Sequence, residues 1–177
     1  QIAAIEPYAV AGLALLGQLT LQNNCLRELA DHSFYGLRSL ETLSLESNFI
    51  AQLGPHAFAG LPRLTQLYLA SNFLRFVAVQ HALSVVSPHL ITLDLRANRL
   101  TSLNAMTSSL DANGTRIAKL FLDNNQIARI EPDSFSAVMS TTETLSLTFN
   151  RLQVVEAHFF VHFTHSLAEL WLSDNQI

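Results

Sequence analysis

Histidines are the first candidates for chemistry in this chain of 177 residues, which contains seven of them. Three lie close together, at His158, His162 and His165, and the four-residue interval between the first two suits metal ligands on one helical face. His158 also has counterparts at the same point of a recurring pattern, eight residues after an asparagine, namely His32 and His56. We therefore interpret this position as a surface preference of the pattern and predict no metal site.

Motifs of enzyme active sites are absent from the sequence. It contains no nucleophile elbow, zinc-protease helix or glycine-rich phosphate loop, and its six glycines are scattered. Serine, histidine and acidic residues are abundant, but their spacing singles out no catalytic trio. We predict that the protein is not an enzyme and uses no cofactor.

Two single residues could be covalently modified, one by N-linked glycosylation and one by disulfide formation. Asn113 begins an Asn-Gly-Thr acceptor for N-linked glycosylation and lies in the longest inserted stretch between repeats. It is the candidate glycosylation site, with a chance match as the alternative. The only cysteine, Cys25, supports no disulfide framework, so we interpret it as an unpaired thiol or as the partner of a cysteine outside this segment.

A repeated segment of the form LxxLxLxxNx[LI] determines where all these residues lie in the fold. It occurs seven times, and few copies differ from this form. Leu40–Ile50 (LETLSLESNFI) is a clear copy. Successive asparagines are 24 to 27 residues apart, the length of one strand and one return segment. Each repeat is therefore one coil of a solenoid, and it packs only on its neighbours. The repeated asparagines are Asn24, Asn48, Asn72, Asn98, Asn125, Asn150 and Asn175.

Alternating apolar and polar residues within each copy predict a short strand with one buried face. Successive coils place these strands side by side in one direction, which makes a parallel sheet. The strands are expected near residues 18–22, 42–46, 66–70, 92–96, 119–123, 144–148 and 169–173. An asparagine amide both donates and accepts hydrogen bonds, so we predict that the stacked asparagines form a ladder that satisfies the backbone of the bend.

The return segments carry a second pattern, in which apolar residues recur 2, 5, 10 and 13 positions after most of the asparagines. The aromatic residue at the third of these positions predicts a stacked phenylalanine spine on the convex side of the core. The predicted spine residues are Phe34, Phe58, Phe135 and Phe160. The return segments after Asn72 and Asn98 are longer and lack this aromatic residue.

The strand pattern LxxLxLxxN, together with return segments such as LRELADHSFYGLRSL, resembles the leucine-rich repeats of extracellular animal proteins. Variable repeat lengths and the phenylalanine spine are similar to chaoptin-like, Toll-like and Slit-like ectodomains, and the long uninterrupted array favours the chaoptin-like group. The resemblance implies an α/β-type solenoid, mostly β with irregular return segments, coiled into a right-handed horseshoe. Its parallel sheet would line the concave face. It also implies a secreted or cell-surface protein that binds other proteins.

Composition and the ends of the sequence bear on two questions: which partners the protein can bind, and whether the chain is one repeat array. The net charge of −4 argues against nucleic acid, which requires a basic face. The longest apolar run, residues 9–17, is far shorter than the roughly 20 residues of a membrane helix, so we predict no direct membrane insertion. Neither end carries a polar capping unit. We therefore expect residues 1–177 to form a single repeat array from the interior of a longer protein.

The outward-facing strand positions are where a partner is expected to bind. They include three large aromatic residues, and aromatic residues and arginine dominate the energy of protein interfaces. The candidate protein-binding residues are Tyr68, Asp94, Arg96, Lys119, Phe121, Asp123 and Trp171. The partner would be an extracellular ligand or a second copy of the protein. Two alternatives stay open: these charges pair across neighbouring strands, or the segment is a structural spacer whose binding site lies elsewhere.

Overall fold

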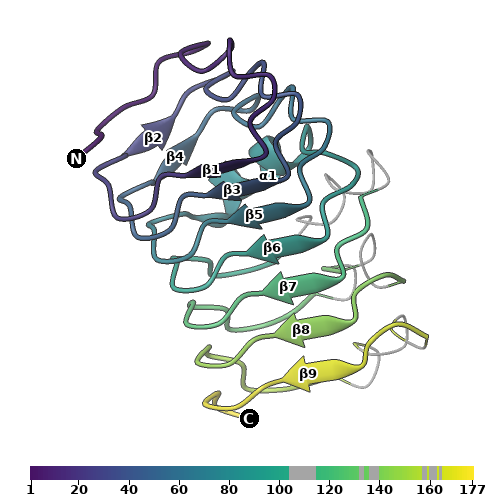
Figure 1. Ribbon diagram of the computed structural model, residues 1–177. Coiled ribbons are helices and arrows are strands. Elements are labelled where there is room, and N and C mark those ends of the chain that lie inside the picture. Colours follow the sequence, from purple (N-terminus) through teal and green to yellow (C-terminus); the bar gives the residue numbers. More distant parts are fainter. Residues whose placement is uncertain (104–114, 132–133, 136–139, 157–158, 160–162, 164) are drawn as a thin grey trace.

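The computed structural model describes residues 1–103, 115–131, 134–135, 140–156, 159, 163 and 165–177. The chain coils into a solenoid, and each coil contributes one short strand to a parallel sheet of seven strands (Figure 1). The strands are β1 (Gln18–Thr20), β3 (Thr42–Ser44), β5 (Gln66–Tyr68), β6 (Thr92–Asp94), β7 (Lys119–Phe121), β8 (Thr144–Ser146) and β9 (Glu169–Trp171). Their spatial order follows the chain, which confirms the predicted fold class.

Each strand is three residues long, shorter than the five expected. Hydrogen bonding between coils continues past the strand, because Leu45 N donates to Tyr68 O at 2.9 Å and Ser47 N to Ala70 O at 3.0 Å. Ser47, however, has a φ of +53°, so the backbone leaves the extended conformation there. The strand is therefore ended by a left-handed residue just before the ladder asparagine.

The asparagines join neighbouring coils through their side chains. The Nδ2 of Asn48 donates to Leu45 O of its own coil at 3.0 Å and to Leu21 O of the preceding coil at 2.9 Å. Its Oδ1 accepts a hydrogen bond from Leu26 N at 3.0 Å. Asn72, Asn98, Asn125, Asn150 and Asn175 repeat this arrangement. Each amide thereby satisfies backbone groups that no strand partner reaches.

The convex half of the core contains stacked phenylalanines. Phe34 and Phe58 are completely buried, and their rings are parallel within 2° with centroids 6.3 Å apart. Further along the array, the buried ring of Phe135 contacts Phe159 at 5.7 Å and Phe163 at 6.1 Å. The fourth predicted spine residue, Phe160, lies outside the described residues.

One return segment folds differently from the others. β2 (Glu28–Leu29) and β4 (Gln52–Leu53) pair in parallel on the return side, and the helix α1 (Phe76–Leu83) packs beside β4 in the next coil (Figure 1). Sequence reasoning expected an irregular segment here. The segment FVAVQHAL contains no proline or glycine, so no residue in it interrupts a helix. Its buried Val79, Ala82 and Leu83 occupy the core in place of a spine phenylalanine.

No helix among the described residues has the length and apolar character of a membrane span.

Phe149 holds a backbone conformation that its side chain disfavours. It precedes a ladder asparagine and has a φ of +53°, in a column otherwise made of smaller residues. Those residues are Asn23, Ser47, Ser71, Ala97, Asn124 and Asp174. Asparagine tolerates this conformation better than other non-glycine residues, so Phe149→Asn is expected to raise the free energy of unfolding by about 1 kcal/mol.

Urea denaturation followed by circular dichroism measures this change. Phe49→Asn is the matched control, because Phe49 is similarly exposed but does not have a positive φ. The control is expected to bring no gain in stability. Equal effects of the two substitutions would show that relief of backbone strain is not the cause.

Candidate functional site

The centre of the sheet carries an arginine held by a buried carboxylate. Asp94, on β6, is completely buried, and both its oxygens accept hydrogen bonds from Arg96 Nε at 2.9 and 3.0 Å. Arg96 Nη2 adds a bond of 2.6 Å, and Arg96 N one of 3.0 Å. The bonds to Asp94 hold the pKa of Arg96 above its ordinary value. About half of the Arg96 side chain remains exposed, so a fixed guanidinium faces solvent.

Two expectations about these charges need correction. Asp94 was a candidate contact residue, but it is buried beneath Arg96 and positions it instead. The alternative of ion pairs between neighbouring strands is also wrong for this pair, because both residues belong to one coil. They lie two positions apart, on the same face of an extended chain, where a short aspartate and a long arginine reach each other.

An aromatic ring adjoins this arginine on the next strand. Phe121 of β7 is the register partner of Asp94, and its ring centroid lies 5.3 Å from Arg96 Cζ. This distance lies within the range of a cation–π interaction. On the other side, Tyr68 of β5 is also in register with Asp94, and its hydroxyl donates to Gln66 Oε1 at 3.0 Å. We name Tyr68, Arg96 and Phe121 the central concave cluster.

Asp123 is less available than the sequence suggested. Its Oδ1 accepts hydrogen bonds from Thr148 N at 3.0 Å, from the Thr148 hydroxyl and from the hydroxyl of the buried Ser146. The carboxylate therefore links β7 to the next coil. It also contributes, with Glu46, to the raised pKa of Arg96. Sequence reasoning missed the roles of Ser146 and Thr148, although both lie in the outward columns beside Asp123.

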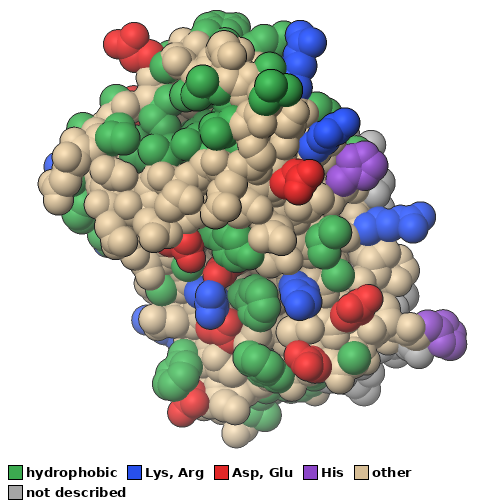
Figure 2. Space-filling model, viewed as in Figure 1, with side chains coloured by type: hydrophobic (Ala, Val, Ile, Leu, Met, Phe, Trp, Pro, Cys, Tyr) green, Lys and Arg blue, Asp and Glu red, His purple; other side chains and the backbone are tan. Residues whose placement is uncertain are grey.

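The two remaining candidates lie apart from the central concave cluster or at its margin. Lys119 is exposed at the start of β7 and forms no ion pair with the residues that the structure describes. Trp171, on β9, is 50 % exposed and two strands away from Phe121. Figure 2 shows basic, acidic and hydrophobic side chains mingled over this part of the sheet. The surface can thus offer both charge and apolar area to a partner.

The convex histidines form a stack. The rings of His32 and His56 lie 5.8 Å apart within 24° of parallel, and Tyr8 stacks on His32 at 5.6 Å. The backbone N–H of His56 bonds to Asp31 at 2.7 Å and holds the pKa of that carboxyl below its ordinary value. Within the part of the chain that the structure describes, no three potential ligands are grouped as a metal site would require.

Several residues considered in the sequence analysis fall outside the described residues. They are the glycosylation candidate Asn113 and two of the clustered histidines, His158 and His162, for which no metal site was predicted. The third clustered histidine, His165, is described and exposed.

Comparisons with known proteins agree with this architecture. A family model described as "Leucine rich repeat" matches residues 14–74 and 115–177. Among solved structures, a crystal structure of a TLR13–ssRNA13 complex superposes with a TM-score of 0.88 at 30 % sequence identity. That match covers 100 % of this chain and 24 % of the other, so this chain spans about a quarter of that protein. No curated protein matches the sequence.

Proposed function

Since the chain belongs to the leucine-rich repeat family, with repeats of Toll-like type, we propose that it binds another protein on its concave sheet. In this proposal it is a segment of a secreted or cell-surface receptor or adhesion protein. Repeat solenoids of this kind serve as binding scaffolds, and the concave surface is the one that successive strands extend. An extracellular location is proposed from the Toll-like type of the repeats.

The observation that carries this proposal is the fixed guanidinium of Arg96. An arginine normally loses side-chain freedom on binding, at a cost of about 0.5–1.5 kcal/mol for such a side chain. Here four hydrogen bonds to the buried Asp94 already restrict Arg96 in the free protein. The ring of Phe121 beside it adds apolar area. A preorganised arginine next to an aromatic ring is typical of the few residues that dominate binding energy.

A protein is favoured over a polyanion as the partner. The similar TLR13 structure contains single-stranded RNA, whereas this chain has a net charge of −4. Attraction by the charges of Asp123 and Glu46 also contributes to the raised pKa of Arg96, so other carboxylates already act on this arginine. A nucleic acid backbone would be repelled by these carboxylates. A protein surface can present one carboxylate to Arg96 and an apolar side chain to Phe121.

We expect Arg96→Ala and Phe121→Ala each to weaken partner binding at least tenfold. Self-association is measured first, by sedimentation of the purified chain at micromolar concentration. A different partner is sought in a library of displayed extracellular domains, and its affinity is then measured by surface plasmon resonance.

Arg27→Ala and Tyr35→Ala are the matched controls, an exposed arginine and an exposed tyrosine off the sheet. They are expected to leave affinity within twofold of the unchanged chain. If the two concave variants bind as tightly as the controls, the concave assignment is wrong. The partner would then contact another face of this chain. If the chain shows neither self-association nor a partner, the alternative of a structural spacer is favoured.

A further inference from the structure

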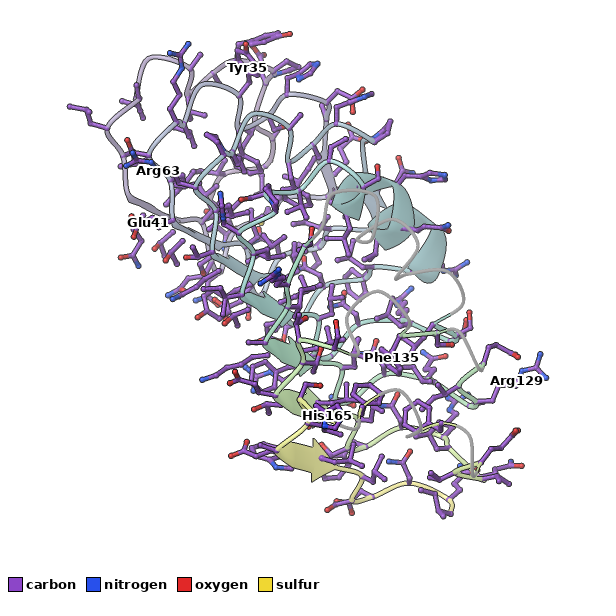
Figure 3. The ribbon with its side chains drawn as sticks, turned by 90° about the vertical axis from the view of Figure 1, so that its right-hand side faces the viewer. Tyr35, Glu41, Arg63, Arg129, Phe135 and His165 are labelled. Carbon is purple, nitrogen blue, oxygen red and sulfur yellow. The ribbon has the colours of Figure 1, made fainter. Side chains whose placement is uncertain are left out.

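A second candidate surface is formed by residues that lie a few positions before the sheet strands, among them Arg63, His89 and Arg116. We name it the lead-in flank. A hollow of about 530 Å³ lies on this flank, and Arg63, His89, Arg116 and Ile91 contribute to its lining. Glu41 lines one end of it. Figure 3 shows Glu41 and Arg63 on one side of the solenoid, opposite Arg129. None of these residues belongs to the central concave cluster.

The basic residues of this hollow form a row across three coils. Ile91 N donates to Thr65 O at 2.8 Å, and Ala118 N donates to Ile91 O at 2.9 Å, so the coils are in register here. Arg63, His89 and Arg116 each precede one of these three residues by two positions. With neighbouring coils about 4.8 Å apart, the backbones of Arg63 and Arg116 are roughly 10 Å apart.

The two arginines of this row carry charges that the described part of the protein does not neutralise. Arg63 and Arg116 are exposed, and neither takes part in the ion pairs among the described residues. Between them lies Ile91, an aliphatic residue that is 47 % exposed. The hollow therefore presents two cations on either side of an apolar contact.

Acidic residues limit the length of this basic row. Glu41 lies at one end of the hollow. Outside the hollow, Glu143 follows in the coil after Arg116, where its N–H donates to Ala118 O at 2.8 Å. A long polyanion that ran along the coils would meet a carboxylate at each end. A ligand with one negative charge at each arginine does not extend as far as Glu143, and guanidinium groups pair with carboxylates in a bidentate geometry.

We propose that this hollow is a second contact site, which takes a helical segment of a protein partner bearing two carboxylates with an apolar side chain between them. The carboxylates pair with Arg63 and Arg116, and the apolar side chain covers Ile91. Residues seven positions apart on one face of a helix are separated by about 10.5 Å, close to the spacing of the two arginines. Binding at this site is independent of the concave proposal, because Arg96 and Phe121 take no part in it.

The probe is a fluorescein-labelled, side-chain-stapled helical peptide with glutamate at positions i and i+7 and leucine at i+4. We expect saturable binding by fluorescence anisotropy in about 50 mM salt, where surface charges are weakly screened. Arg63→Gln with Arg116→Gln is expected to weaken binding at least tenfold, and Ile91→Ala several-fold. The same peptide with both glutamates replaced by glutamine is expected to bind at least tenfold more weakly.

The matched control is Arg27→Gln with Arg75→Gln, which removes the same charge from two exposed arginines outside this hollow. It is expected to keep peptide affinity within twofold. Unchanged thermal melting of both double variants shows that folding is intact. The proposal is overturned if the unaltered protein shows no saturable binding, or if both double variants lose affinity equally. It is also overturned if heparin or a single-stranded oligonucleotide binds through Arg63 and Arg116 more tightly than the peptide does.

Discussion

Replacing Phe58 with alanine is expected to lower the free energy of unfolding by about 3–5 kcal/mol. The ring is completely buried and stacks on Phe34 at a centroid distance of 6.3 Å. Truncation removes apolar area from the core and leaves a cavity that the rigid coils on either side cannot close. Urea denaturation followed by circular dichroism measures the change.

Phe49→Ala is the control for this prediction. Phe49 also stacks on a phenylalanine of the next coil, Phe73, at 6.0 Å, but it is 49 % exposed. Its loss is expected to cost less than about 1.5 kcal/mol, the upper range for an aromatic pair. If Phe49→Ala destabilises the protein as much as Phe58→Ala, stacking and not burial holds the coils together.

The second large effect is expected for Asn98→Ala, which should lower the free energy of unfolding by about 3 kcal/mol. The Nδ2 of Asn98 donates to Leu69 O, Leu95 O and Arg96 O at 3.0 to 3.1 Å. Its Oδ1 accepts a hydrogen bond from Leu74 N at 2.9 Å. Alanine leaves the buried N–H of Leu74 without its acceptor. It also removes one donor from each of the three carbonyls, which keep their bonds from Asn72, Asn125 and Ser71.

Asn24→Ala tests the same chemistry at an exposed position of the ladder. Asn24 donates to Leu21 O at 3.0 Å and to Gln22 O at 3.3 Å, and it accepts from Ile2 N at 2.8 Å. Its bonds lie closer to solvent, so water can replace them and the expected loss is about 1 kcal/mol. Equal losses at Asn24 and Asn98 would show that desolvation of the backbone groups does not set the cost.

Both large effects are expected to change the shape of the unfolding transition as well as its midpoint. Each coil of a solenoid is stabilised by its neighbours alone, so a defect in one interface weakens the coupling between the two sides. The denaturation curves of Phe58→Ala and Asn98→Ala should therefore be broader than that of the unaltered chain.

The sequence predicted the architecture well because one coil is specified seven times. Apolar residues at a period of two indicate a strand, and the recurring asparagine marks where each coil turns. Local exceptions were harder to recognise. The segment Phe76–Leu83 has an apolar pattern that either an irregular return or a short helix can satisfy, and packing beside β4 accompanies the helix.

At the candidate site, too, the repeat pattern predicted where residues lie along the coils but not which side chains are buried. The outward columns placed Arg96 and Phe121 in neighbouring coils, and their side chains lie next to each other there although Arg96 follows the end of β6. They also placed Asp94 on the surface, where it is not found. Whether an outward side chain reaches solvent depends on the length of its neighbours, and the longer arginine covers the shorter aspartate. A periodic pattern contains no information on that outcome.

The sequence by itself determined the coil length, the parallel sheet and the residues that fill the core, because these follow from the spacing of leucine, asparagine and phenylalanine along one chain. Only the tertiary structure decided that Asp94 is buried beneath Arg96, that Asp123 links two coils, and that Arg63 and Arg116 share one hollow. In each case, side chains from different coils contact one another or line one hollow, or one side chain covers another. The physical reason is that burial and pairing are properties of contacts in space, which a repeat period constrains but does not specify.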